Sequence, residues 1–85
     1  MNAVETGWNS LPEATREIFG RLEQADEPGR SAILKEMPRD DLSTVLREVA
    51  CARRMELGKR VDAPMSEGFP IRTIESVLRS MRAHL

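Results

Sequence analysis

The chain has 85 residues, of which 40% are hydrophobic and 32% are charged, and its formal net charge is −1. A chain of this length supports one domain with one core, and its composition excludes the disordered and collagen-like classes. One cysteine, Cys51, and one histidine, His84, exclude an internal disulfide and a Cys/His zinc site, and no motif suggests another metal or a cofactor.

The sequence has no apolar run long enough to span a bilayer, and its first ten residues, MNAVETGWNS, lack the basic and apolar stretches of a secretory signal. We therefore expect a soluble, cytoplasmic protein that makes no use of a membrane. The expected organisation is a single helical domain over residues 1–85, with a flexible N-terminus at residues 1–9.

The first helix is expected over residues 10–25. The stretch SLPE has the spacing of a capping box, in which Ser10 accepts from the amide three residues on and Glu13 reaches back. Trp8, just before this cap, is expected to cover the end of the bundle. The apolar side chains recur at intervals of three and four and so form one stripe. They are Leu11, Ala14, Ile18, Leu22 and Ala25, with Phe19 on the flank.

The second helix is expected to be short, over residues 28–37, with Asp26 as its cap and Pro38 as its stop. The third is expected over residues 40–57 and should end at Gly58. The side chains expected in the core are Ile33, Leu34 and Met37 from the second helix, and Leu42, Val45, Leu46, Val49 and Ala50 from the third.

The end of the third helix breaks its apolar pattern, because the same face continues with Arg53 and Glu56, which are rarely buried unless paired. The last turns are therefore expected to overhang the core. Residues 58–69 carry turn formers and no period, which predicts a long, mobile loop. A final helix is expected over residues 70–84, opened by Pro70. Its apolar stripe is Ile71, Ile74, Val77, Leu78, Met81 and Leu85.

Alternation at period two never persists over five residues, so the sequence predicts no strand. The expected fold class is all-α, a compact bundle of about four helices, one of them short, with a long loop before the C-terminal helix. The stretch IFGRLEQADEPGRSAILKEMPRDDLSTVLREV, about a third of the chain, resembles the N-terminal helical solenoid of MgtE-type magnesium transporters in its leucine spacing. The resemblance implies stacked short helices, but the chain lacks the acidic cation-binding array of that family.

Charge is distributed unevenly along the chain. Residues 1–42 hold five basic and nine acidic side chains, whereas residues 43–85 hold eight and five. Such a dipole could bind a polyanion, orient a protein partner or help the two halves to pack. The candidate polyanion-binding residues are Arg53, Arg54, Arg72, Arg79 and Arg82.

The final helix carries a row formed by Arg72, Arg79 and Arg82, and Glu75 is spaced to pair with the first two. This row suggests nucleic-acid binding as an alternative function. The long loop before the helix is wrong for a helix-turn-helix, however, and the sequence pI of about 5.8 is not that of a basic domain. The simpler interpretation is that the row is a solvated helix face, which requires no ligand.

A second candidate site is an adaptable apolar patch of sulfur-containing and aromatic side chains, of the kind that binds proteins. Its members are Cys51, Met55, Met65 and Phe69, and Trp8 is a separate candidate for partner binding. An exposed Trp8 would be a binding hot spot. The competing interpretation is that the loop or the final helix folds back and buries the other four.

A strip of small residues, Thr73, Ser76, Ser80 and Ala83, is expected on the far face of the last helix, either as a dimer or partner seam or as plain solvent surface. Cys51 and His84 could act as a catalytic dyad only if the fold brought them together. The sequence thus favours a non-enzymatic protein-binding or regulatory module, an adaptor or inhibitor of a larger protein partner. A nucleic-acid-binding regulator is the alternative, and a homodimer is a third option.

Overall fold

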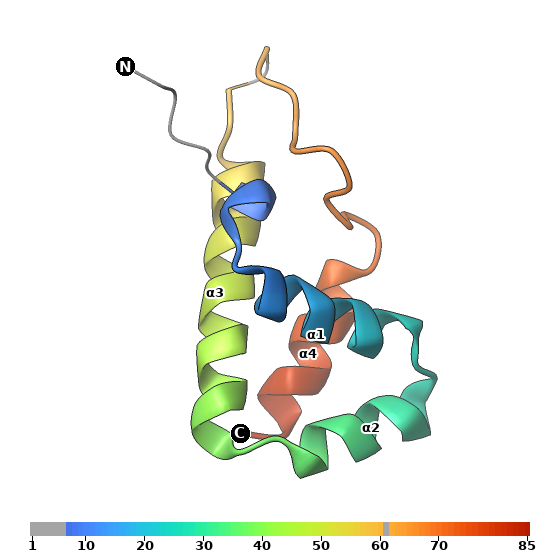
Figure 1. Ribbon diagram of the computed structural model, residues 1–85. Coiled ribbons are helices and arrows are strands. Elements are labelled where there is room, and N and C mark those ends of the chain that lie inside the picture. The colour runs from blue at the N-terminus through green and yellow to red at the C-terminus, as the bar shows by residue number, and fades with distance from the viewer. Residues whose placement is uncertain (1–6, 61) are drawn as a thin grey trace.

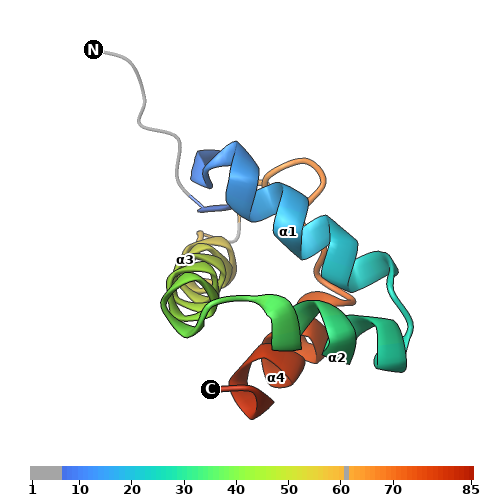
Figure 2. The same ribbon diagram turned by 60° about the horizontal axis from the view of Figure 1, so that its bottom comes forward.

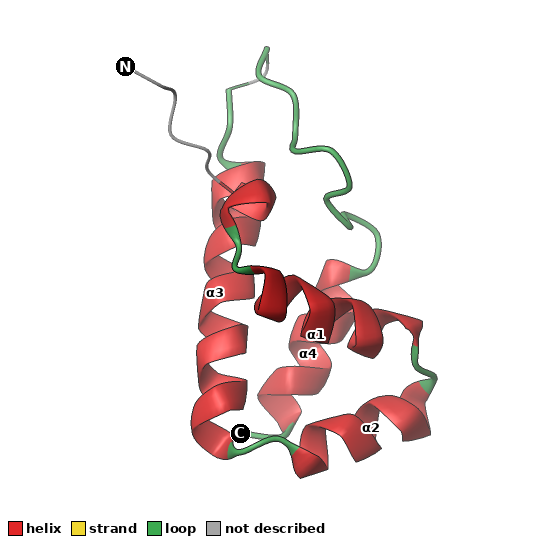
Figure 3. Ribbon diagram, viewed as in Figure 1, coloured by secondary structure: helices red, strands yellow, loops and turns green. Residues whose placement is uncertain are grey.

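The computed structural model describes residues 7–60 and 62–85, and within them it contains helices and no strand. The elements, in chain order, are a 3-10 turn η1 (Gly7–Ser10) and the helices α1 (Glu13–Gln24), α2 (Glu27–Glu36), α3 (Arg39–Leu57) and α4 (Ile74–Ala83). The all-α prediction, with four helices and a long gap between the last two, is confirmed (Figure 3). None of these helices is long and apolar enough to cross a membrane.

The four helices pack around one core, with α3 along one side of the molecule and α1 crossing in front of α4 (Figure 1). The core is formed by Leu22 and Phe19 from α1, by Leu34 from α2 and by the inward faces of α3 and α4. Viewed from below, α2 lies between α1 and α4 (Figure 2). The loop between α3 and α4 extends beyond the ends of both helices (Figure 1).

The start of α1 differs from the predicted capping box. Pro12 precedes the helix and no side chain caps it, while the Ser10 hydroxyl donates instead to the Gly7 carbonyl at 2.8 Å within η1. The reason is that η1 already uses Ser10, and Pro12 with its fixed φ leads directly into the helix. In contrast, the predicted cap of α2 is confirmed, because the Asp26 carboxylate accepts from the Gly29 amide at 2.8 Å.

The inward face of α1 is rotated relative to the prediction. Thr15 is buried and Ala14 is exposed, whereas the prediction placed Ala14 in the stripe. The Thr15 hydroxyl donates to the Glu48 carboxylate of α3 at 2.7 Å, so this buried polar group is satisfied. Ile18 is only half-buried as a result.

The last helix begins later than predicted. Pro70 is followed by a turn, in which the Pro70 carbonyl accepts from the amides of Thr73 and Ile74, and α4 starts only at Ile74. Both ends of the predicted stripe are therefore outside the core, with Ile71 53% exposed and Leu85 43% exposed. The middle of the stripe is buried as predicted, at Ile74, Val77, Leu78 and Met81.

The end of α3 does not overhang the core, which contradicts the sequence-based expectation. Glu56 is only 1% exposed, and its carboxylate is surrounded by donors from distant parts of the chain. It accepts from the backbone amide of Trp8 at 2.7 Å and from that of Ser66 at 2.9 Å, and it pairs with the Lys59 ammonium at 2.8 Å. We call this cluster the Glu56 clamp, because it ties η1 and the loop to α3.

The electrostatics of the clamp favour the charged carboxylate. Burial alone would raise the pKa of the Glu56 carboxyl, but the hydrogen bonds from Lys59, Ser66 and Trp8 outweigh burial and lower the pKa to about 2. Gly7 makes room for the carboxylate, since a Cβ on Gly7 would lie 2.2 Å from a Glu56 oxygen, and its φ of +81° suits glycine. Glu56 is therefore ionised and held in place near neutral pH.

Trp8 joins the N-terminal turn to the core. Its ring lies edge-on to Phe19 with 4.9 Å between centroids and edge-on to Phe69 of the loop with 6.0 Å. Trp8 is buried, which confirms that it covers the end of the bundle. Of the N-terminal segment 1–9 expected to be flexible, Gly7 and Trp8 are thus packed against α3 and α1, and residues 1–6 lie outside the described range.

Candidate functional site

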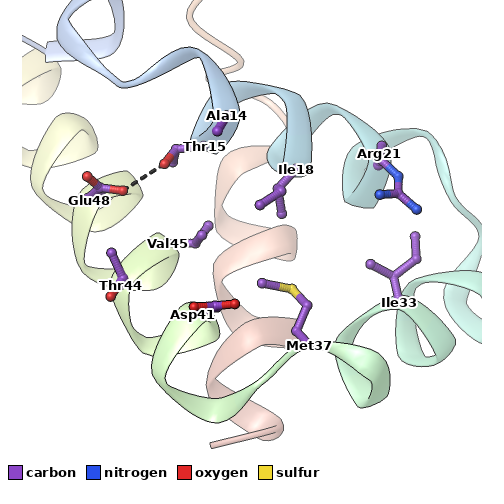
Figure 4. A pocket seen from close by; sticks show the side chains of 10 residues that line it. All are labelled: Ala14, Thr15, Ile18, Arg21, Ile33, Met37, Asp41, Thr44, Val45 and Glu48. Atoms are coloured by element: carbon purple, nitrogen blue, oxygen red, sulfur yellow. Dashed lines mark hydrogen bonds between the residues drawn. The ribbon is translucent and has the colours of Figure 1, made fainter.

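The best candidate for a binding site is a groove where α1, α2 and α3 meet, with a volume of about 350 Å³ (Figure 4). Its middle is apolar, because Ile18 of α1, Val45 of α3 and Met37, which directly follows α2, point into it. We call it the three-helix groove. It is lined by Ala14, Thr15, Ile18, Arg21, Ile33, Met37, Asp41, Thr44, Val45 and Glu48.

The three-helix groove exists because α2 is short and its apolar side chains are only partly covered. Ile33 and Met37 pack against the core but stay half-buried, as does Ile18 opposite them. These residues were predicted as core, and their helical spacing gave no sign that they would border an open groove.

Charged side chains flank the groove with opposite signs on its two sides. Asp41 and Glu48 project from α3, and Arg21 projects from the end of α1 (Figure 4). Glu48 is already engaged by Thr15, whereas Asp41 is exposed at the rim. An apolar middle with a few charged groups at its edge is the usual composition of a recognition site.

The five side chains predicted to bind a partner do not come together on one surface. Trp8 is buried and lies edge-on to the half-buried Phe69, while Met65 is 41% exposed on the loop. Only Cys51 and Met55 share a surface, a hollow of about 410 Å³ next to Leu11 and Pro12. Trp8 is not an exposed hot spot, because the clamp and the two phenylalanine rings bury it.

The arginine row is exposed but is not neutralised in the predicted way. Glu75 pairs with Arg53 of α3, with Arg53 Nε 2.5 Å from Glu75 Oε1, rather than with Arg72 or Arg79 of its own helix. This ion pair links α3 to α4 and occupies Arg53, which is half-buried. The other four candidates for polyanion binding, Arg54, Arg72, Arg79 and Arg82, are exposed.

The strip of small residues on α4 faces α1 and α2 rather than the far side. The Thr73 hydroxyl donates to the Glu23 carboxylate of α1, and Ser76 and Ser80 both accept from Arg30 of α2. The sequence did not single out Arg30. It lies in the first turns of α2, and no local spacing indicates a contact with residues 46 and 50 positions later.

The only cysteine and the only histidine lie in different surroundings. Cys51 of α3 borders the hollow beside Leu11. His84 lies at the C-terminal end of α4, where it contacts the Ser31 hydroxyl and the Ser80 carbonyl. Within residues 7–60 and 62–85, no three His, Cys, Asp or Glu side chains are grouped to hold a metal ion.

Comparison with known proteins does not assign the chain to a family. The chain matches no protein-family model, no curated protein and no solved structure at a significant level. The similarity of residues 18–49 to MgtE-type helical solenoids therefore rests on leucine spacing alone.

Proposed function

We propose that the protein is a non-enzymatic protein-binding module, an adaptor or inhibitor, whose three-helix groove receives an amphipathic helix of a larger partner. The observation that supports this most is the apolar middle of the groove between two acidic residues of α3 and one basic residue of α1. Helix-in-groove recognition uses apolar anchors at positions i, i+3 or i+4, and i+7 of the bound helix.

Charge complementarity defines the expected partner. Its helix carries bulky apolar side chains on one face, and lysine or arginine on the flank that meets Asp41 and Glu48. An acidic residue on the other flank would meet Arg21. The apolar anchors supply most of the binding energy, and the charges set orientation and the rate of encounter.

Selection of peptides from a displayed random library tests the proposal without knowledge of the natural partner. The peptides recovered should combine apolar residues at helical spacing with basic residues. Asp41→Lys should weaken their binding roughly tenfold, because it reverses the charge at the rim. Asp40→Lys is the matched control, since Asp40 is also exposed in the first turn of α3 but does not line the groove.

A second pair of variants tests the apolar part of the groove. Ile33→Glu should abolish peptide binding, whereas Ile71→Glu, the same change at a residue that is 53% exposed in the loop, should leave it unchanged. Circular dichroism of both variants checks that they remain helical, which is the expected result. If no peptide is selected, or if both members of either pair behave alike, the groove is not the docking site.

A nucleic-acid-binding regulator is the second candidate, supported by the exposure of Arg54, Arg72, Arg79 and Arg82 in the C-terminal half. Binding through several arginines should weaken steeply between low and physiological salt, whereas binding in an apolar groove should hardly respond. Replacing Arg72, Arg79 and Arg82 together would abolish the former and spare the latter.

A further inference from the structure

A second hollow lies between α2 and α4 and has the opposite character to the three-helix groove, since it is bordered mainly by polar donors. Its volume is about 330 Å³. The two helices lie side by side at this place (Figure 2). It is lined by Glu27, Arg30, Ser76, Arg79 and Ser80, and we call it the Arg30 hollow.

Arg30 is held in a fixed position at the base of this hollow. Its Nε donates to the Leu22 carbonyl at the end of α1 at 2.9 Å. Its Nη1 donates to the hydroxyls of Ser76 and Ser80 on α4, at 3.0 Å and 3.2 Å. Three contacts from two other helices orient a planar fork of five N–H donors, and these contacts do not use the donors of Nη2.

Arg79 places a second positive charge at the same hollow. It lies between Ser76 and Ser80 on the exposed surface of α4. Among the described residues, the ion pairs involve neither Arg30 nor Arg79. Glu27, which is exposed at the rim, is the one acidic side chain in the lining and offsets only part of the charge of the two arginines.

His84 and Ser31 extend the polar surface next to the Arg30 hollow, at the C-terminal end of α4. His84 Nδ1 lies 3.1 Å from the Ser80 carbonyl, which can only accept, so Nδ1 carries the proton. In the neutral ring, Nε2 then accepts from the Ser31 hydroxyl at 3.4 Å. The histidine thus has a defined orientation beside the two arginines.

We propose that the Arg30 hollow binds a phosphate group, either as the free dianion or as a monoester on a small molecule. The Arg79 guanidinium can offer a pair of parallel N–H donors to phosphate oxygens, and Arg30 adds the N–H donors of Nη2, which its contacts with Leu22, Ser76 and Ser80 leave unused. The Ser76 hydroxyl accepts from Arg30 and keeps its own proton for a further contact. None of these residues lines the three-helix groove, so this site is independent of the proposed protein-binding function.

Titration with inorganic phosphate, followed by ¹H–¹⁵N NMR at constant ionic strength, tests the site directly. Saturable shifts are expected at Arg30, Ser76, Arg79 and Ser80, and no such shifts when sodium chloride replaces phosphate. A parallel titration with glycerol 3-phosphate distinguishes the two sources of the group. Tighter binding of the ester supports a small-molecule ligand, and equal or weaker binding supports the free anion.

Two variants with the same change of charge on the same helix give the decisive comparison. Arg79→Gln should weaken phosphate binding roughly tenfold, because it removes a charge-assisted pair of hydrogen bonds. Arg82→Gln should change it less than about twofold, because Arg82 is exposed but does not line the hollow. Arg79 has no structural hydrogen bond among the described contacts, so the variant should fold normally.

Three results would overturn the proposal. The first is the absence of phosphate-specific shifts. The second is an equal loss of binding in Arg79→Gln and Arg82→Gln, which would indicate a diffuse basic surface. The third is a single-stranded oligonucleotide that binds far more tightly than phosphate and is weakened alike by Arg72→Gln, Arg79→Gln and Arg82→Gln, which would assign the arginines to nucleic acid.

Discussion

The Glu56 clamp and the Arg30 hollow are two polar clusters whose central charges have opposite signs. The charge is compensated by protein groups in the clamp, whereas in the hollow it is compensated only in part. In the clamp, a buried carboxylate is surrounded by protein donors from Trp8, Ser66 and Lys59. In the hollow, a half-buried guanidinium and an exposed one stand beside serine hydroxyls, with Glu27 alone at the rim.

The difference indicates which cluster serves the fold and which one is available to a ligand. A buried charge is tolerated when the protein itself supplies the opposite charge and the hydrogen bonds, as in the clamp. A surplus of cations at a surface hollow needs no such partner from within the chain, because solvent supports it. The clamp is therefore structural, and an anion from outside can complete the hollow.

The largest loss of stability is expected when the Glu56 clamp is removed. Glu56→Ala should lower the free energy of unfolding by about 3 to 5 kcal/mol, because the buried amide of Trp8, the partly buried amide of Ser66 and the Lys59 ammonium lose their acceptor. Urea denaturation followed by the fluorescence of Trp8, the only tryptophan, measures the change next to the clamp itself.

Glu67 provides the control for this variant, because it is exposed in the same loop. Glu67→Ala should change the free energy of unfolding by less than about 0.5 kcal/mol. If the two variants lose similar amounts, the clamp does not hold the fold, and the distinction between a closed and an open cluster fails.

Acid should weaken the Glu56 clamp, and the expected loss of stability is similar to that in Glu56→Ala. The pKa of Glu56 is about 2 in the folded protein and near the ordinary 4.5 when unfolded. Between these values the unfolded state binds more protons, so the stability contributed by Glu56 is complete above pH 4.5 and is lost as the pH falls toward 2. The shift corresponds to about 3 kcal/mol.

Glu56→Gln isolates this contribution from that of the other carboxyl groups. The wild type should lose about 3 kcal/mol more than the variant between pH 5 and pH 2, as measured by urea denaturation at each pH. Parallel pH curves for the two proteins would mean that Glu56 has an ordinary pKa in the folded state.

The helices could be predicted from the sequence because their determinants are local. The periodicity of α3 and α4 identified their buried faces, and Asp26 and Gly58 marked two helix ends correctly. The beginning of α4 was predicted four residues early, at Pro70 instead of Ile74, because a turn over Pro70 takes up the first amides. A proline at the start of a helix and a proline in a preceding turn look alike in sequence.

The two polar clusters could not be predicted, because long-range contacts create them. Glu56 breaks an apolar stripe and so indicated exposure, but its partners at Trp8 and Ser66 lie 48 and 10 residues away. Arg30 carried no signal at all, and of the arginines expected to bind a polyanion only Arg79 lies beside it. Helical spacing reveals which face is apolar but not which buried charge finds donors.

The smallest expected effect concerns the space that the clamp leaves at Gly7. Both Gly7 and Gly68 have a positive φ, of +81° and +80°, but only Gly7 has a neighbour where a Cβ would lie. Gly68→Ala should cost about 1 kcal/mol for its backbone conformation alone. Gly7→Ala should cost about 2 to 3 kcal/mol, because the methyl group must also displace the Glu56 carboxylate from its donors. Urea denaturation measures both, and in a Glu56→Ala background the difference should vanish. If Gly7→Ala costs no more than Gly68→Ala in the wild type, the carboxylate is loosely held and the clamp is as open to exchange as the Arg30 hollow.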